Sequence, residues 1–330
     1  SRNFTPAPAH ASERLYQLHA RTHAHAAMST GDFKDKQFAE EEVADKVVEQ
    51  YDLAHARVFY KYVMGGGGMD IHYGVFKSPT DGVYESSKET NKRLMQALDW
   101  MQPITKDSVV LDVGSGHGGL SHELIQNYGC KVVGINISPE QNKMNEDEAT
   151  KLGVGDRNEV LLMNFNDGLP SAFDNKFTHV ISCEVLCHAA SKPKLLEDIK
   201  RVMKPGGAFA FTDIMGADGA NEKALKDFTD RNATTEMARP SGYRTLLTDG
   251  GFRDVSFCDF SAHLGTYFQS MVDQINKHRE DMKKEGVTDA YLDKWMDSLT
   301  QRVDIQTKEE VFAWGIFMCR KAGPIYGLKA

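Results

Sequence analysis

The sequence lacks the features of several common protein classes. It has no excess of positive charge, because 39 lysines and arginines stand against 47 aspartates and glutamates and the net charge is −8. Such a balance provides no field to attract nucleic acid or an anionic membrane surface. It has no uninterrupted apolar run of about 18 residues, the length that a membrane-spanning helix needs. We therefore expect a small-molecule partner, no nucleic acid and no membrane, and a monomer or homodimer.

Cysteine is scarce, and its spacing argues against two further uses. The five cysteines are odd in number, widely spread and mostly within apolar runs; they are Cys130, Cys183, Cys187, Cys258 and Cys319. This usage is typical of buried, reduced thiols rather than of disulfides. No zinc-type CxxC pair occurs, and we expect no metal site. The expected location is the cytoplasm, or a plastid if the N-terminus is a trimmed targeting segment.

Helical spacing and glycines divide the chain of 330 residues. Residues 1–40 are predicted to be a flexible N-terminal tail. Residues 41–102 are predicted to form a helical lid or lead-in, because apolar and aromatic side chains recur at steps of three and four. Four glycines at 65–68 interrupt this pattern and predict a hinge or close-approach loop. Residues 103–330 are predicted to be one α/β domain with a helical cap at about 221–310.

From Val109 onward, strand-like and helix-like segments alternate. Strands are predicted at 109–113, 131–137, 159–163, 177–182, 208–212, 255–260 and 311–320. Helices are predicted at 120–128, 139–152, 195–203, 221–232 and 243–249, and 267–301 is predicted to be mostly helical. Alternation of this kind builds a mostly parallel sheet with helices on both faces. The fold class is therefore α/β and Rossmann-like.

The segment VVLDVGSGHGGL, Val109 to Leu120, passes from an apolar strand into glycines and then into a helix. The glycines let the backbone turn tightly and approach a ligand, with the N–H groups of the helix start directed at negative charge. The spacing GxGxG lacks the full dinucleotide fingerprint GxGxxG, and Asp112 lies within the strand end. In a turn of this form the backbone can hold an amino-acid carboxylate.

Several longer motifs carry a family resemblance. LDVGSGHGG, GINIS, SPEQ and RVMKPGGAFAFTD together resemble class I S-adenosylmethionine-dependent methyltransferases. More narrowly, FYKYVMGGGGMDIHYGVF, NISPEQNKMNE, CEVLCHAASKPKLLEDIKRVMKPGG and SGYRTLLTDGGF resemble the sarcosine/dimethylglycine methyltransferases that complete the osmolyte glycine betaine. The similarity runs from Tyr51 to Arg320. It implies a methyltransferase with a seven-stranded sheet, S-adenosylmethionine as cofactor and S-adenosylhomocysteine as product.

The resemblance also implies a set of cofactor-binding residues. They are Gly114, Ser115 and Gly116 around the methionine moiety, Asn136, Ile137 and Gln141 at the ribose and adenine, Asn164 and Phe165 at the adenine, and in addition Asp112 and Cys183. Asn136 stands where most class I enzymes have an acid, and its amide oxygen can still accept from a ribose hydroxyl. Asn164 and Phe165 could equally be an ordinary polar turn and a core aromatic.

Glu184 and His188 follow the fourth predicted strand, at the edge where open α/β sheets bind their ligands. Their spacing of four residues predicts that both lie on one helical face, where they could orient a reactive amine and aid the loss of its proton. A similar acid and histidine occur in phosphoethanolamine methyltransferases, and a buried structural pair is the alternative. Cys183 and Cys187 share this spacing and are expected to pack, because no activating base for a thiol is evident.

The remaining candidates concern the methyl acceptor. Arg239, Tyr243 and Arg244 could bind a substrate carboxylate, because a guanidinium matches it with two parallel hydrogen bonds, or they could belong to a surface loop. Aromatic rings near the glycine run could stabilise a methylated ammonium or sulfonium cation. These candidates are Tyr60, Tyr62 and Tyr73, together with His72 in the same segment.

The acceptor itself stays open among three chemistries. Sarcosine or dimethylglycine, a zwitterionic amine with a carboxylate, is favoured by the resemblance. A thioether acid such as methylthiohydroxybutyrate, on the route to dimethylsulfoniopropionate, would use the same arginines and aromatic rings, whereas a phosphobase would need more cationic side chains. Outside enzymes, a catalytically silent cofactor-binding scaffold is the alternative. A nicotinamide dehydrogenase is disfavoured because Asn136 replaces the expected acid.

Overall fold

The computed structural model describes residues 54–65, 68–221, 223–225 and 237–323, and the statements below concern these residues. The predicted tail at 1–40 lies outside them. So do the first part of the predicted lead-in and most of the helix predicted at 221–232.

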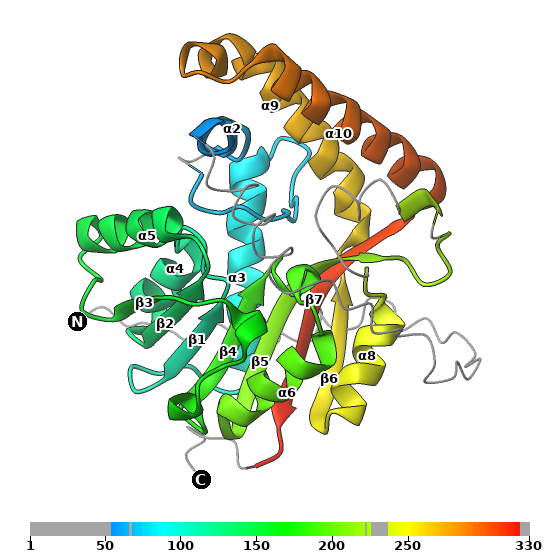
Figure 1. The fold of residues 1–330 in the computed structure, drawn as a ribbon. Helices are drawn as coiled ribbons and strands as arrows, with labels where there is room; N and C mark the ends of the chain where they lie inside the picture. The colour runs from blue at the N-terminus through cyan, green and yellow to red at the C-terminus, as the bar shows by residue number, and fades with distance from the viewer. Residues whose placement is uncertain (1–53, 66–67, 222, 226–236, 324–330) are drawn as a thin grey trace, which may run out of the picture. The chain divides into compact units, whose positions relative to one another are not determined.

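Within the described residues, seven strands form one sheet in the order β3-β2-β1-β4-β5-β7-β6 (Figure 1). The strands are β1 (Val109–Val113), β2 (Lys131–Asn136), β3 (Asn158–Leu162), β4 (Phe177–Cys183), β5 (Met203–Gly216), β6 (Phe252–Asp259) and β7 (Phe312–Lys321). Strands β1 to β5 pair in parallel, and β7 runs antiparallel to both of its neighbours, β5 and β6. The predicted sheet is therefore confirmed. The order reverses between β1 and β4, and parallel sheets open a crevice at such a point.

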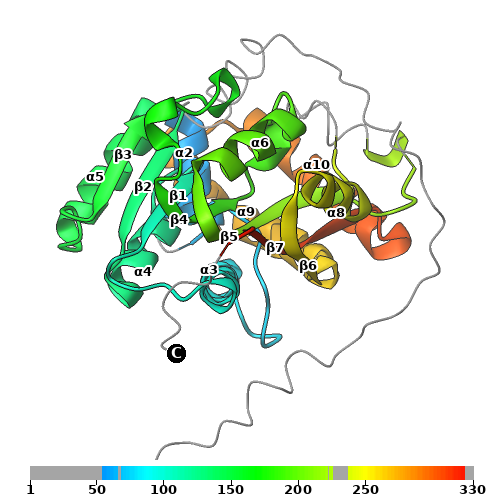
Figure 2. The ribbon, with the colours of Figure 1, turned by 90° about the horizontal axis from the view of Figure 1, so that it is seen from below.

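Two layers of helices cover the two faces of this sheet, and Figure 2 shows α3 and α4 on the face opposite to α6 and α8. The helices of the sheet layer are α3 (Val83–Met101), α4 (Gly119–Tyr128), α5 (Pro139–Lys151), α6 (Lys192–Val202) and α8 (Pro240–Asp249). Leu94, Leu98 and Leu124 share one buried cluster with the sheet, whereas Ile199 and Leu247 belong to a second. Both faces of the strands are thus buried, as their continuous apolar runs require.

The β5 strand is longer than predicted. We expected a strand at 208–212 after a helix stop at residues 204–207, but β5 already begins at Met203, which pairs with Phe177. The register shifts between Phe177 and His179, and Gly206 adopts a φ of 81° there. The glycines therefore form an irregularity within the strand pairing rather than a loop before it.

Three further helices form a separate group: α2 (Ala54–Val63), α9 (Leu264–Lys284) and α10 (Asp289–Glu309). Figure 1 shows them together beyond one end of the sheet, with α9 and α10 running side by side. Phe59 of α2 is fully buried and stacks on Trp295 of α10, with ring centroids 4.7 Å apart. The range predicted as a cap, 221–310, contains α9 and α10, but α8 and β6 within that range belong to the sheet layers. None of the described helices is long and apolar enough to cross a membrane.

Candidate active site

A cavity of about 1020 Å³, open to solvent, lies across the carboxyl ends of β1, β2 and β4. Every residue predicted from the resemblance to bind the cofactor lines it: Asp112, Gly114, Ser115, Gly116, Asn136, Ile137, Gln141, Asn164, Phe165 and Cys183. These residues are distant in the sequence, and the parallel sheet gathers them because each lies in or next to the carboxyl end of a strand.

The glycine turn between β1 and α4 forms one wall of the cavity. Gly114 and Gly116 have φ angles of 79° and 50°, in the left-handed region that favours glycine. A Cβ on Gly114 would lie 2.4 Å from Val185 Cγ2, whereas a Cβ on Gly116 would meet nothing within 4 Å. The backbone N–H groups of Gly114 and Ser115 both donate to Ile135 O, at 2.8 and 3.1 Å, which ties the turn to β2. Gly114 thus permits close packing against Val185, and Gly116 leaves the cavity open at its position.

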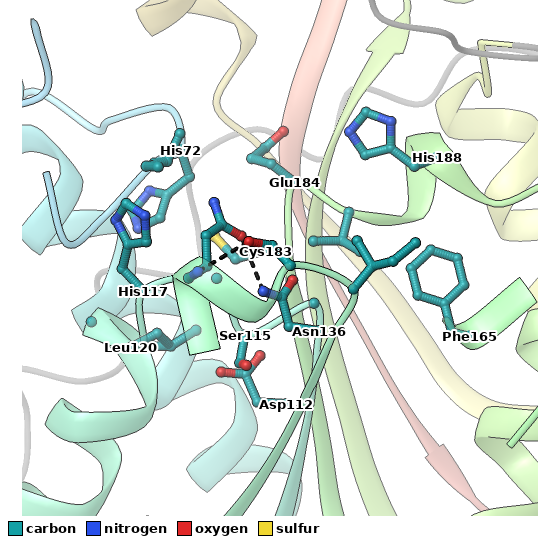
Figure 3. A pocket seen from close by; sticks show the side chains of 18 of the residues that line it. His72, Asp112, Ser115, His117, Leu120, Asn136, Phe165, Cys183, Glu184 and His188 are labelled. Atoms are coloured by element: carbon teal, nitrogen blue, oxygen red, sulfur yellow. Dashed lines mark hydrogen bonds between the residues drawn. The ribbon is translucent and has the colours of Figure 1, made fainter. Parts of the chain in front are cut away.

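Polar side chains hold the opposite wall. Asn136 Nδ2 donates to Gln141 Oε1 at 3.0 Å, and Gln141 N donates to Ser138 Oγ, the N-cap of α5, at 3.0 Å (Figure 3). Asp112 Oδ2 accepts from Ser121 Oγ at 2.6 Å, and burial raises the pKa of Asp112 to about 6. The helix cap therefore orients the two amides toward the cavity, and Asp112 anchors the start of α4.

A second cavity, of about 610 Å³, adjoins the first. The two share Ile71, His72, Glu184 and His188 as lining residues. The rest of the second cavity comes from α2 and the segment after it, from the turn after β4, from β5 and from the helices of the cap: Tyr60, Met64, Tyr73, Cys187, Ile214, Tyr267, Met271, Trp295 and Arg302. Of the predicted acceptor-binding residues, Tyr60, His72 and Tyr73 line this cavity.

Glu184 and His188 line both cavities, but not for the reason predicted. We expected them on one helical face; instead Glu184 has a φ of 58° directly after β4, and His188 ends the short 3-10 turn η4 (Leu186–His188). A left-handed φ is uncommon outside glycine and prevents a helix from starting at Glu184. Figure 3 shows both side chains, with His72, at one end of the first cavity, whereas Asp112 and Asn136 lie at the other.

The carboxyl group of Glu184 is held in an unusual state. Its Oε1 accepts from Trp314 Nε1 of β7, and its other oxygen, Oε2, has no hydrogen bond within the described part of the chain. Burial, reinforced by the charge of Asp213, raises the pKa of Glu184 to about 8. Glu184 is consequently protonated near neutral pH and acts as a polar neutral group there.

Two charged residues of the glycine-rich segment stand against the first cavity. Asp70 Oδ2 pairs with Lys88 Nζ at 2.7 Å, and Asp70 Oδ1 accepts from Asn91 Nδ2 at 2.8 Å and lies 3.7 Å from His72 Nε2. Burial alone would raise the pKa of Asp70, but the contacts with His72 and Lys88 outweigh it and hold that pKa well below its usual range. Burial alone would lower the pKa of His72, but Asp70 raises it. This buried network connects α3 to the segment that lines both cavities.

Four of the residues predicted to contact the acceptor line neither of the two cavities. Tyr243 is fully buried behind the sheet, where its hydroxyl donates to Asp213 Oδ2 at 2.6 Å. Arg239 donates to the carbonyl oxygens of Ala217 and Ala220, and exposed Arg244 donates to Val255 O. Tyr62 lies on the outer side of α2.

Tyr62 differs from Tyr60 because a step of two residues along a helix turns a side chain to the opposite side. Its hydroxyl donates to Glu285 Oε1 at 2.5 Å, on the surface, while Tyr60 is buried. Sequence reasoning missed Asp70, Trp314 and Arg302. The helical spacing of 289–309 places Trp295 and Arg302, seven residues apart, on one face, which is the signal that could have marked Arg302.

A sheet of this order, with a glycine turn after β1 and a cavity across the carboxyl ends of its central strands, defines the Rossmann-like fold of the class I methyltransferases. Comparison with known proteins assigns the chain within this class. A family described as a methyltransferase domain matches residues 104–290. The chain belongs to this family and is an S-adenosylmethionine-dependent methyltransferase.

The relatives agree with the narrower resemblance seen in the sequence. The chain is 30% identical to a sarcosine/dimethylglycine N-methyltransferase of Halorhodospira halochloris over 273 residues, 83% of this chain and 95% of the relative. It is 29% identical to the enzyme of that name from Aphanothece halophytica over 280 residues, 84% of this chain and 98% of the relative. A crystal structure from Galdieria sulphuraria, provisionally described as a sarcosine dimethylglycine methyltransferase, is also similar. It has a TM-score of 0.73 and 26% identity, and the match covers 80% of this chain and 97% of that one.

Proposed function

We propose that this enzyme methylates a small acceptor that carries a carboxylate, with sarcosine or dimethylglycine as the acceptor and glycine betaine as the final product. The observation that supports this most directly is the second cavity. It adjoins the first cavity at Ile71, His72, Glu184 and His188, and aromatic side chains line it. The relatives named for these two acceptors cover most of the chain, which supports the same choice.

The first cavity fits S-adenosylmethionine by the chemistry of its walls. The glycine turn offers backbone and open space at Gly116, which suits an amino-acid end group, and Asn136 and Gln141 offer amides to a ribose. Phe165 also lines this cavity and can cover a base with its ring. When bound, this cofactor supplies an electrophilic methyl group on a sulfonium. We propose the residues predicted from the resemblance as its binding set.

The second cavity would hold the acceptor with its nucleophilic atom at the junction of the two cavities. The lone pair of that atom forms the new bond to the methyl carbon, and the electron pair of the broken carbon–sulfur bond stays on the cofactor's sulfur. The packing of α2, α9 and α10, the proposed lid and cap, around the second cavity would align the reacting atoms. Tyr60, Tyr73 and Trp295 present aromatic rings, which stabilise a cationic product.

One observation favours the second candidate, the thioether acid. An amine reacts only as the free base, so it must lose its ammonium proton, whereas a thioether is neutral from the start. Because the pKa of Glu184 is raised to about 8, its carboxyl is a poor proton acceptor near neutral pH. A phosphobase is disfavoured, because Arg302 is the single lysine or arginine among the described residues that line the two cavities.

The test is an acceptor panel with product identification. The protein is incubated with S-adenosylmethionine and, separately, with sarcosine, dimethylglycine, methylthiohydroxybutyrate or phosphoethanolamine, and products are identified by mass spectrometry. We expect turnover with dimethylglycine, and expect its rate to rise as the pH passes through about 8, where Glu184 ionises and can accept the ammonium proton. Turnover restricted to the thioether acid, with no such rise, would select the second candidate. Tight cofactor binding without turnover on any acceptor would select the silent scaffold.

A further inference from the structure

The second cavity contains a cation that neither the resemblance nor the motifs had indicated. Arg302 lies on α10, is 7% exposed and lines this cavity. No other lysine or arginine among the described residues lines either cavity. An arginine keeps its charge when buried, so Arg302 provides a permanent positive charge on the acceptor side of the site.

Neighbouring aromatic rings set the position of the guanidinium. Its Cζ lies 5.9 Å from the centroid of Phe268 of α9, in cation–π geometry. The charge of Arg302 also acts on Tyr73, another lining residue: burial raises the pKa of that hydroxyl, and Arg302 opposes the rise. Tyr73 in turn packs edge-on against Phe268, with centroids 5.7 Å apart. The guanidinium of Arg302 therefore lies on the side of α9 and α10 that faces the second cavity.

The cap that carries Arg302 is connected to the reactive end of the site. Tyr267 of α9 lines the same cavity, and its hydroxyl donates to His72 O at 2.7 Å. Trp295 lies seven residues before Arg302 on α10, hence on the same face, and stacks on Phe59 of α2. These contacts hold the cap at a defined position relative to His72.

We infer that Arg302 binds the carboxylate of the methyl acceptor and thereby orients the nucleophilic atom toward Glu184 and His188. This inference rests on the proposed function and names the group that selects its substrate class. A guanidinium presents two parallel N–H donors that match the two oxygens of a carboxylate. The two arginines expected for this role, Arg239 and Arg244, donate to backbone carbonyl groups outside the cavities.

The test compares three variants: Arg302→Met, which keeps an unbranched apolar stem and removes the charge, Arg302→Lys, which keeps the charge and removes the fork, and Arg244→Met as the matched surface control. With dimethylglycine and with methylthiohydroxybutyrate, we expect Arg302→Met to raise KM by about 100-fold, because it removes charge-assisted hydrogen bonds. Arg302→Lys should raise it by about tenfold, and Arg244→Met by less than about twofold. The affinity for S-adenosylhomocysteine, measured by calorimetry, should stay unchanged in all three and serves as the folding control.

A binding measurement separates this inference from the proposed function. Dimethylglycine and methylthiohydroxybutyrate are titrated into the protein saturated with S-adenosylhomocysteine, where no turnover is needed. Binding to the wild type but not to Arg302→Met supports the inference even if neither acid is methylated, and in that case the proposed function alone fails. Equal binding to both proteins, or binding of neither acid to the wild type, overturns it. A second readout is dimethylaminoethanol, which lacks the carboxylate: Arg302→Met should lose the preference of the wild type for the acid over this alcohol.

Discussion

Replacing Glu184 by glutamine should make the protein more stable near neutral pH, and it should lower the activity with an amine acceptor above about pH 8, where the wild-type carboxyl ionises. Glutamine has the shape of a protonated glutamate and can still accept from Trp314 Nε1, but it never ionises. The wild-type carboxyl has an ordinary pKa of 4.5 when unfolded and about 8 when folded. A group whose pKa is raised on folding contributes its full stability below the unfolded pKa and loses it as the pH rises toward the folded pKa.

The magnitude follows from these two values. At about pH 7 the unfolded carboxyl is ionised and the folded one is protonated, and one pKa unit corresponds to about 1.4 kcal/mol. The difference in pKa thus destabilises the wild type by about 3 kcal/mol at pH 7, and by less than about 1 kcal/mol at pH 5. Glu184 stands at the wall of an open cavity, where water screens part of this effect. We therefore expect a difference between the two pH values of about 2 kcal/mol.

The assay is urea unfolding of the wild type, Glu184→Gln and a surface control, Glu280→Gln, at about pH 5 and about pH 7. Glu280 is an exposed residue of α9 that pairs with Lys283, and its replacement should change the free energy of unfolding by less than about 0.5 kcal/mol at both pH values. Glu184→Gln should match the wild type near pH 5 and exceed it near pH 7. A difference between wild type and Glu184→Gln that is the same at both pH values would refute the reasoning about the buried carboxyl. Unchanged turnover in this variant would remove Glu184 from the reaction.

Three further predictions concern the glycine turn, the buried network and α2. Gly114→Ala should cost about 2–4 kcal/mol of stability, because the strain of its left-handed φ and the clash of the new Cβ with a neighbouring valine add together. Gly153→Ala, with a φ of 70° and open space around its Cβ, should cost about 1–2 kcal/mol. Thermal unfolding measures both losses, and equal losses would contradict the steric argument. Asp70→Asn should destabilise by about 2 kcal/mol at neutral pH, because it removes one of the two carboxylates that pair with Lys88, the other being Glu123, and removes the acid beside His72. The difference should shrink only as the pH falls below about 3.8 in urea titrations, and a loss that persists in acid would point to packing instead. Tyr60→Ala should raise the KM for the acceptor by about tenfold or more, because Tyr60 lines the second cavity. Tyr62→Ala should leave the KM unchanged, because Tyr62 contacts Glu285 on the surface. Equal kinetic effects of the two variants would mean that the second cavity is not the acceptor site.

The fold was predictable because its signals are local. Each buried strand appears as an apolar run of about five residues, and the caps that end the neighbouring helices, such as Ser138 before α5, are visible in the sequence. The order of elements and the glycine turn then imply that the carboxyl ends of the parallel strands lie along the same edge of the sheet. The proposed cofactor-binding residues came from the family resemblance, and the sheet brings them to one cavity because its parallel strands end at the same edge.

The acceptor side was less predictable, because its residues come from segments far apart in the sequence. Tyr60 and Tyr62 carry similar side chains, and only the docking of α2 against α9 and α10 decided which one is buried. The spacing of Glu184 and His188 suggested a helix, but β4 continues to Cys183 and pairs with Thr212, so Glu184 takes a left-handed turn beneath Trp314. Local spacing does not report a hydrogen bond formed 130 residues away.

The sequence by itself determined the class of enzyme and the sheet, and its family resemblance named residues that line the first cavity, because short-range patterns and motifs are sufficient for those. The tertiary structure alone decided which of several arginines lines a cavity. Arg244 lies in a motif that resembles the family and Arg239 lies just before it, yet both stand outside the two cavities, while Arg302 of the amphipathic helix α10 lines the second one. Helical periodicity defines a buried face, but the identity of the neighbour that covers it depends on packing between α9, α10 and the sheet.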